Sequence, residues 1–129
     1  MDDYFVPATS CSPEIDFRFS QHILSIRGES YPENAAAFYG PVIASLKGYL
    51  ESLDGCSAEI NVELKYFNSS STKILLGLFE TLNNSVRAGN DIILNWYYHE
   101  EDDTILEFGE DLHSDFGLLT FNPIAVADA

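Results

Sequence analysis

The chain has 129 residues, and 46% of them are hydrophobic, so it can bury a core and is not disordered. Six Lys and Arg residues face 21 Asp and Glu residues, which gives a net charge of −15 at pH 7. This charge repels phosphate backbones and anionic lipids, so we exclude nucleic-acid and membrane partners and keep two explanations, plain solubility and a basic protein partner. The N-terminus carries no export signal, so we expect one domain over residues 1–129 in the cytoplasm.

The N-terminal half predicts a hairpin followed by a helix. Residues 1–12 contain a proline and small polar residues, and we expect them to form a loose arm. Apolar and polar residues alternate over 15–19, and a second apolar run follows at 23–28, so these two segments predict a pair of antiparallel strands. The YPEN segment at 31–34 predicts a helix start with proline in the first position. Pro41 lies inside the helical pattern and predicts a kink or a later start.

The C-terminal half alternates strands with helices. Its predicted segments, in chain order, are a strand at 60–66, a helix after NSSST at 68–72 with its apolar face over 74–86, a strand at 92–98, a helix from Asp102 to Leu112, a short strand at 118–121 and a soft tail at 123–129. The whole order is β-β-α-β-α-β-α-β. This order predicts the α/β class, with a mixed, mostly parallel sheet and helices packed on it.

No residue pattern predicts catalysis, a cofactor or a metal site. The acidic run at 100–103 is typical of a solvated loop before a helix. Asp111, His113 and Asp115 occupy alternate positions of a helix and so do not share a face. The chain has no glycine-rich phosphate loop, GxSxG or HExxH motif, and we expect a protein that is not an enzyme.

The stretch YFNSSSTK at 66–73 places four consecutive hydroxyls between a predicted strand and a predicted helix. Asn68 or Ser69 can cap the helix by accepting a hydrogen bond from a free amide, which accounts for one or two of these side chains. The other interpretation is a phosphorylation site, because a phosphoryl group is compatible with a helix N-terminus. Spacing alone favours capping.

This polar junction and the order of elements resemble the STAS domains of anti-sigma-factor antagonists. In those domains the helix after a central strand begins with a phosphorylatable serine in an Asp-Ser-Ser motif. Asn68 stands here where that motif has Asp, and the STAS register would make Ser70 the acceptor.

The chain also resembles the SiaC family of regulatory phosphoproteins in bacterial biofilm control. The likeness rests on GESYPEN at 28–34, on YFNSSSTK at 66–73 and on the W-x-Y pattern at Trp96 and Tyr98, and it covers nearly the whole chain. In that family the motif reads Leu-Asn-Thr-Ser-Ser and the threonine after Asn accepts the phosphate. Carried onto this sequence, the acceptor is Ser69, with Ser70 as the second choice.

The SiaC resemblance implies a non-enzymatic switch with three protein partners. A Ser/Thr protein kinase phosphorylates the protein, a PP2C-type phosphatase reverses this, and the unphosphorylated form binds and activates a diguanylate cyclase. Around the acceptor, the residues expected to shape the site are Asn68, Ser71, Thr72 and Lys73. The candidate partner surface is Tyr31, Pro32, Glu33 and Asn34.

Two alternatives remain open. An anti-sigma-factor antagonist would share the switch chemistry and act on a different target. A small-molecule-binding domain would use the same strand-to-helix edge, with the hydroxyls and Tyr31 lining a deep pocket, whereas the switch predicts a shallow, exposed surface.

Overall fold

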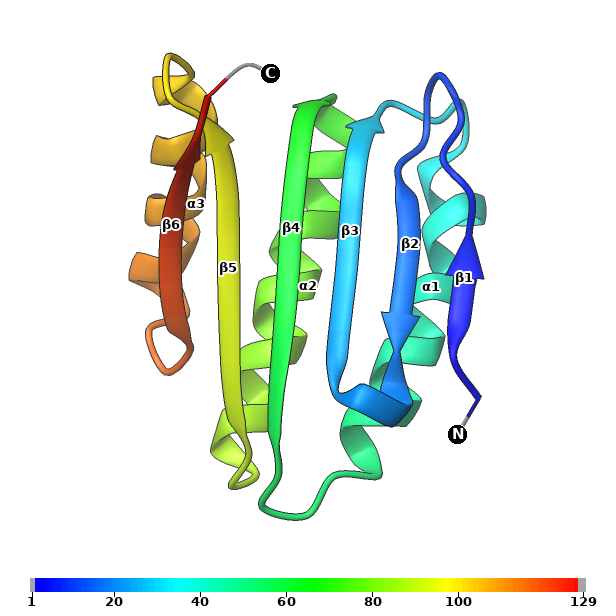
Figure 1. The fold of residues 1–129 in the computed structure, drawn as a ribbon, viewed down its shortest axis with the longest axis vertical. Helices are drawn as coiled ribbons and strands as arrows, with labels where there is room; N and C mark the ends of the chain where they lie inside the picture. The colour runs from blue at the N-terminus through cyan, green and yellow to red at the C-terminus, as the bar shows by residue number, and fades with distance from the viewer. Residues whose placement is uncertain (1, 128–129) are drawn as a thin grey trace.

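A computed structural model, which describes residues 2–127, shows one β-sheet with three helices behind it (Figure 1). The six strands follow one another in the sheet in chain order. The strands are β1 (Tyr4–Val6), β2 (Glu14–Arg18), β3 (Ile23–Ser30), β4 (Ser57–Phe67), β5 (Asp91–His99) and β6 (Thr120–Val126); the helices are α1 (Ala35–Glu51), α2 (Ser69–Arg87) and α3 (Asp103–Asp115), and a 3₁₀ turn η1 covers Phe19–Gln21. The predicted α/β class and mixed, mostly parallel sheet are confirmed.

The pairing of the strands explains why all the helices lie on one face. The strands β2 and β3 form the predicted antiparallel hairpin, and β3, β4, β5 and β6 are parallel neighbours. Each of α1, α2 and α3 therefore connects one strand to the next across a single step in the same direction. Because such crossovers share one hand, all three helices pack on the same face of the sheet (Figure 1).

The core lies between the sheet and the helices. Each strand directs alternate residues to this side, among them Ile60 and Val62 on β4, which are almost completely buried. Trp96 on β5 anchors α3, because its Nε1 donates a hydrogen bond of 2.9 Å to the carbonyl oxygen of Ile105. The same indole leaves no room for a side chain at Gly109, where a Cβ atom would lie 2.6 Å from Trp96 Nε1. Packing thus requires glycine at that position.

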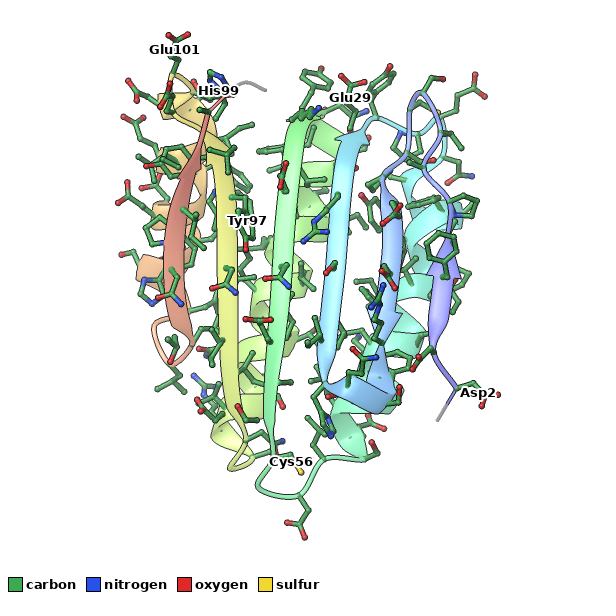
Figure 2. All side chains as sticks on the ribbon, in the orientation of Figure 1. Asp2, Glu29, Cys56, Tyr97, His99 and Glu101 are labelled. Carbon is green, nitrogen blue, oxygen red and sulfur yellow. The ribbon has the colours of Figure 1, made fainter. Side chains whose placement is uncertain are left out.

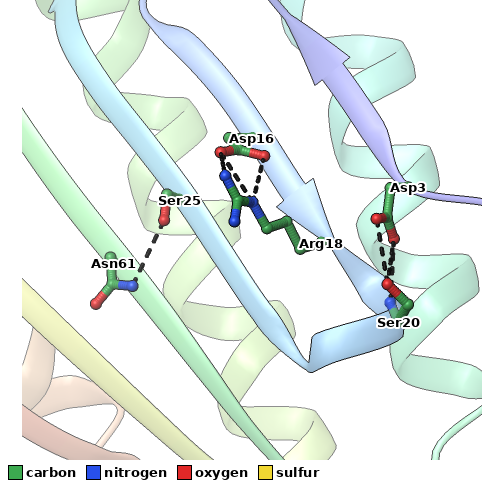
Figure 3. Close-up of polar contacts among 6 residues, drawn as sticks. All are labelled: Asp3, Asp16, Arg18, Ser20, Ser25 and Asn61. Carbon is green, nitrogen blue, oxygen red and sulfur yellow. Dashed lines mark hydrogen bonds and ion pairs between the residues drawn. The ribbon is translucent and has the colours of Figure 1, made fainter.

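The opposite face of the sheet carries no helix, which is unusual for parallel strands. Four side chains at one level of neighbouring strands form a ladder of hydrogen bonds across this open face. Asn61 donates to Ser25 over 3.5 Å, Asn95 donates to Asn61 over 2.9 Å, and Asn122 donates to Asn95 over 3.1 Å. Figure 3 shows the Ser25 end of this asparagine ladder beside the Asp16–Arg18 ion pair. The ladder provides hydrogen-bond partners for buried polar side chains on the face of the sheet that no helix covers.

The N-terminal arm is more ordered than we predicted. Tyr4–Val6 forms the edge strand β1 and pairs antiparallel with β2. The carboxylate of Asp3 accepts hydrogen bonds of 3.1 Å from both the backbone amide and the hydroxyl of Ser20, which fixes the start of the arm to η1 (Figure 3). The loose-arm prediction is therefore wrong for residues 3–6.

Two further boundaries differ from the sequence predictions. The last strand runs over Thr120–Val126, so most of the predicted soft tail belongs to β6, and residues 128–129 lie outside the described part of the chain. Pro123 is compatible with this strand because β6 is at the sheet edge. Helix α1 begins after Asn34 instead of at Pro32, and it continues through Pro41 to Glu51.

Across residues 2–127, no helix combines the length and the apolar character needed to span a membrane.

Candidate functional site

The candidate site is the junction where β4 ends and α2 begins. Asn68 is extended and is the N-cap of α2, and its Oδ1 accepts a hydrogen bond of 3.0 Å from the Ser71 amide. The carbonyl oxygen of Asn68 accepts bonds of 3.1 Å from both the amide and the hydroxyl of Thr72. One asparagine residue therefore organises the first turn of α2.

Ser71 belongs to a buried network of three hydroxyls, formed by Ser30, Tyr39 and Ser71. These residues are 0%, 3% and 1% exposed. Ser71 Oγ donates to the Ser30 carbonyl oxygen over 3.0 Å and lies 2.7 Å from Ser30 Oγ, which also bonds to the Tyr39 hydroxyl. All three hydroxyls are thus hydrogen-bonded inside the core, and either oxygen can be the donor in the Ser30–Ser71 and Ser30–Tyr39 pairs.

Burial governs the ionisation of Tyr39 in this network. It raises the pKa of the Tyr39 phenol, and the hydrogen bond with Ser30 lowers it by a smaller amount. The phenol therefore stays protonated at neutral pH. The network joins the end of β3, the first turns of α1 and the start of α2.

Ser69 and Ser70 are in a different environment, although they belong to the same turn. Both are exposed, at the first two positions of α2. The backbone amides at these positions have no acceptor within a helix, and the helix dipole is positive here, so an added phosphoryl group would be stabilised. Lys73 is exposed one turn further along α2, within reach of a group on Ser69.

The YPEN segment lies beside this junction, as its place after a parallel strand predicts. The Asn68 amide donates to the Ser30 carbonyl oxygen over 3.0 Å, and the rings of Tyr31 and Tyr66 meet edge to face with centroids 5.6 Å apart. Both rings are exposed, at 39% and 52%. Figure 2 shows Glu29 at this end of the sheet and Cys56 at the other end.

The predicted partner surface is only partly exposed. Pro32 is buried, whereas Tyr31, Glu33 and Asn34 are exposed. Asn34 is the N-cap of α1, and its Oδ1 accepts a bond of 3.0 Å from the Ala37 amide. The exposed aromatic pair adds Tyr66 to this surface, a residue that the sequence did not single out.

Ser69 and Ser70 line neither of two cavities found in the described part of the chain. A groove of about 580 Å³ runs between α1 and α2. A cleft of about 460 Å³ lies near the ends of β4 and β5 and is lined by Glu63, Tyr97 and Asp102 among others. Within residues 2–127, no group of three or more His, Cys, Asp or Glu side chains is arranged to hold a metal ion.

Sequence reasoning missed the partners of Ser71. Ser30 stands inside the GESYPEN motif and follows an apolar strand, which was a usable signal that its side chain faces inward. Tyr39 has no such signal, because a tyrosine on the apolar side of a helix is indistinguishable from other core aromatics. Their meeting with Ser71 is a property of the tertiary structure.

Comparison with known proteins places the chain in a protein family. The model of the SiaC family regulatory phosphoprotein matches residues 6–126. An uncharacterised protein of Pseudomonas aeruginosa (strain UCBPP-PA14) is 30% identical over 116 residues, which are 89% of this chain and 90% of that protein.

Solved structures give the same result in three dimensions. Apo-SiaC from Pseudomonas aeruginosa superposes with a TM-score of 0.88 at 28% identity, over 97% of this chain and 100% of that one. A chain in the crystal structure of the diguanylate cyclase SiaD in complex with its activator SiaC, from the same organism, superposes with a TM-score of 0.84 at 27% identity, over 98% of this chain and 100% of that one. The similar structures include one of an activator bound to its cyclase.

Proposed function

Because the chain belongs to the SiaC family of regulatory phosphoproteins, we propose that it is a non-enzymatic phospho-switch whose unphosphorylated form binds and activates a diguanylate cyclase. The likeness to SiaC, which is the activator in the SiaD complex, supports the cyclase as target. Release from the cyclase follows phosphorylation by a Ser/Thr kinase, and a PP2C-type phosphatase restores the active form.

The observation that carries this proposal is that the four hydroxyls at 69–72 differ in burial and in hydrogen bonding. Ser71 is buried in the hydroxyl network and Thr72 bonds back to Asn68, so both serve the fold. Ser69 and Ser70 are exposed at the helix start. Ser69 follows Asn68 directly, which is the acceptor position in the family motif, so we assign the phosphate to Ser69.

The chemistry at Ser69 is a phosphoryl transfer between the hydroxyl and ATP. The Ser69 oxygen attacks the γ-phosphorus, the bond to ADP breaks, and the hydroxyl proton passes to the kinase. The product adds roughly −1.5 to −2 charges at pH 7, next to a helix N-terminus that tolerates them. The phosphatase hydrolyses the same P–O bond with water and regenerates the hydroxyl.

The first experiment tests the acceptor. The protein is incubated with ATP and its kinase, and intact mass with phosphopeptide mapping gives the stoichiometry and the position of the phosphate. We expect one phosphate on wild type and on Ser70→Ala, and none on Ser69→Ala. Full phosphorylation of Ser69→Ala would overturn the assignment.

The second experiment tests the target. Each diguanylate cyclase of the same organism is assayed for cyclic di-GMP synthesis with unphosphorylated protein, phosphorylated protein or no addition. We expect one cyclase to be stimulated by the unphosphorylated form alone. Stimulation of none of them would contradict the cyclase as target and favour the anti-sigma alternative.

A further inference from the structure

We propose that the cleft between the C-terminal ends of β4 and β5 binds an aliphatic diamine, a ligand with an ammonium group at each end of an apolar chain. The inference goes beyond the proposed function, because it concerns a different site. Within residues 2–127, the lining of the cleft contains none of the hydroxyls at 69–72. Its volume of about 460 Å³ is in the range of small-molecule sites.

The cleft exists because β4 and β5 separate before they end. Their register closes with the pair Glu63 and Tyr97, yet β4 continues to Phe67 and β5 to His99. Each strand stays paired on its other side, β4 with β3 up to Phe67 and β5 with β6 up to His99. The two halves of the sheet therefore diverge toward this end, as Figure 1 shows, and side chains from both faces of the sheet line the cleft.

Each face of the sheet contributes one tyrosine and one carboxylate to the cleft. Glu63 and Tyr97 each lie two residues after an asparagine of the ladder, so both are on the face that carries no helix (Figure 2). Tyr98 is on the opposite face, where it packs against the core, and Asp102 lies on that side at the start of α3. All four side chains are half-buried. A ligand with two positive ends can therefore meet a tyrosine and a carboxylate at each end.

These four side chains lack the partners that similar groups have elsewhere in the fold. The other five tyrosines of the chain all make ring contacts, whereas within residues 2–127 Tyr97 and Tyr98 make none and their hydroxyls form no hydrogen bond. In the same part of the chain, the one ion pair within 4 Å joins Arg18 to Asp16. Both carboxylates of the cleft are thus without a cation.

An ammonium group is the ligand end that suits such a pair. It forms charge-assisted hydrogen bonds with a carboxylate and is attracted to the face of a tyrosine ring. Asp102 uses Oδ1 as the N-cap of α3, 3.1 Å from the Ile105 amide, which leaves its second oxygen for a ligand. Leu64, Ile105 and Val126 also line the cleft and supply apolar contact for a chain of methylene groups.

The charge around the cleft favours a cation over an anion. After Arg87 the sequence contains no Lys or Arg, although it carries acidic residues at 100–103 and along α3. Lys65 is the one Lys or Arg in the lining formed by the described residues. It is exposed, so its long side chain can hold the ammonium group in water.

The first test uses the unphosphorylated protein alone, so it needs neither a kinase nor a cyclase. Isothermal titration calorimetry at about 0.15 M salt compares 1,4-diaminobutane and 1,6-diaminohexane with butylamine and hexylamine, which have the same chains and one ammonium group. We expect one diamine to bind per protein, roughly tenfold more tightly than its monoamine. Absence of diamine binding, or equal affinities for diamine and monoamine, would overturn the inference and leave the proposed function intact.

Variants that remove one charge locate the site. Glu63→Gln and Asp102→Asn keep the size of the side chain, and asparagine is as good an N-cap as aspartate, so both should melt near the wild-type temperature. We expect each to weaken diamine binding roughly tenfold and to remove its advantage over the monoamine. The matched control Glu110→Gln removes a charge from an exposed position of α3 and should bind within about twofold of wild type. Equal losses in all three variants would show attraction to the overall charge of the protein and overturn the inference.

The sign of the ligand charge is tested by Lys65→Gln. Loss of the lysine from the lining should tighten diamine binding about twofold, because a like charge no longer opposes the ligand. Weaker diamine binding by this variant would contradict a site for cations. If Asp102→Asn melts early, Tyr97→Leu replaces it in the same titrations, with an expected loss of about threefold from the missing ring. Unchanged diamine binding by Tyr97→Leu would then overturn the inference.

Discussion

The starts of α1 and α2 share one kind of cap and differ in the residues of the first helical turn. Asn34 and Asn68 are both N-caps, and each accepts a hydrogen bond of 3.0 Å from the amide three residues later. After the cap, α1 continues with three alanines at 35–37 and α2 with three serines at 69–71. A single asparagine is therefore enough to start a helix in this protein.

The difference shows that the serines of α2 are present for reasons other than capping. Serine is a weaker helix former than alanine, so α2 begins with a less favourable sequence than α1. Ser71 offsets this through the hydroxyl network with Ser30 and Tyr39. Ser69 and Ser70 are exposed and bring no comparable gain, which makes them the residues to explain by function.

The largest effect on stability is expected for Ser71→Ala, which makes the third residue of α2 the same as that of α1. Removal of the buried hydroxyl leaves the Ser30 hydroxyl without this hydrogen-bond partner and the Ser30 carbonyl without its second donor, at a cost of about 1 to 3 kcal/mol in the free energy of unfolding. Denaturant titration measures this cost. The control Ala37→Ser changes the exposed counterpart in α1 and should alter the free energy by less than about 0.5 kcal/mol. Equal effects at the two positions would refute the comparison.

A smaller effect is expected when the shared cap is removed. Asn68→Ala and Asn34→Ala should each reduce the free energy of unfolding by about 1 kcal/mol, because each leaves one helix amide without its acceptor. The two values should agree within error if the caps are equivalent. A much larger loss for Asn68→Ala would show that Asn68 stabilises more of the fold than the start of α2 alone.

Tyr39→Phe tests the hydroxyl network at the start of α2 through the pH dependence of the free energy of unfolding. At neutral pH we expect a loss below about 1 kcal/mol, since Ser30 keeps its bond to Ser71. The pKa of Tyr39 is raised in the folded protein, so above pH 10 the unfolded chain loses this proton first and wild-type stability falls as pH rises. Tyr39→Phe should show a shallower decline over that range. A remaining decline is expected from Tyr49, whose pKa burial raises to about 12.

The smallest effect is expected for Ser70→Ala, which removes an exposed hydroxyl from the same turn. Its unfolding free energy should stay within about 0.5 kcal/mol of wild type, as for other surface changes. Thermal melts of the two proteins side by side provide the measurement. A loss as large as that of Ser71→Ala would mean that Ser70 also serves the fold, and the functional explanation would narrow to Ser69.

Most of the fold could be predicted from the periodicity of apolar residues, and the exceptions share a cause. The edge strand β1 has only three residues, too few for an alternating pattern, and it exists because β2 is available as a partner. The predicted soft tail at 123–129 begins with Pro123, yet a proline is tolerated at the sheet edge that β6 occupies. In both cases the neighbouring strand, which is absent from local sequence, decides the structure.

The candidate site was predictable in its position but not in its internal arrangement. The cap at Asn68 and the exposure of a helix start follow from local chemistry. Which hydroxyl turns inward depends on the helix rotation against β3 and α1, and Ser30 lies 41 residues before Ser71. The acceptor stays a prediction from resemblance, since the SiaC motif implies Ser69 and the STAS register implies Ser70.

The asparagine ladder also has a consequence for how the parallel strands find their alignment. Asn61 and Asn95 are 6% and 7% exposed, and both are hydrogen-bonded in the ladder, although Asn95 also donates to Glu59 Oε1 over 3.1 Å. A slip of one residue between β4 and β5 would turn one amide toward the apolar core, and a slip of two would part the pair. Misaligned sheets thus carry unsatisfied amides that the correct sheet does not. The hydrogen bonds on the helix-free face of the sheet therefore favour the strand register in which the opposite face packs against the helices.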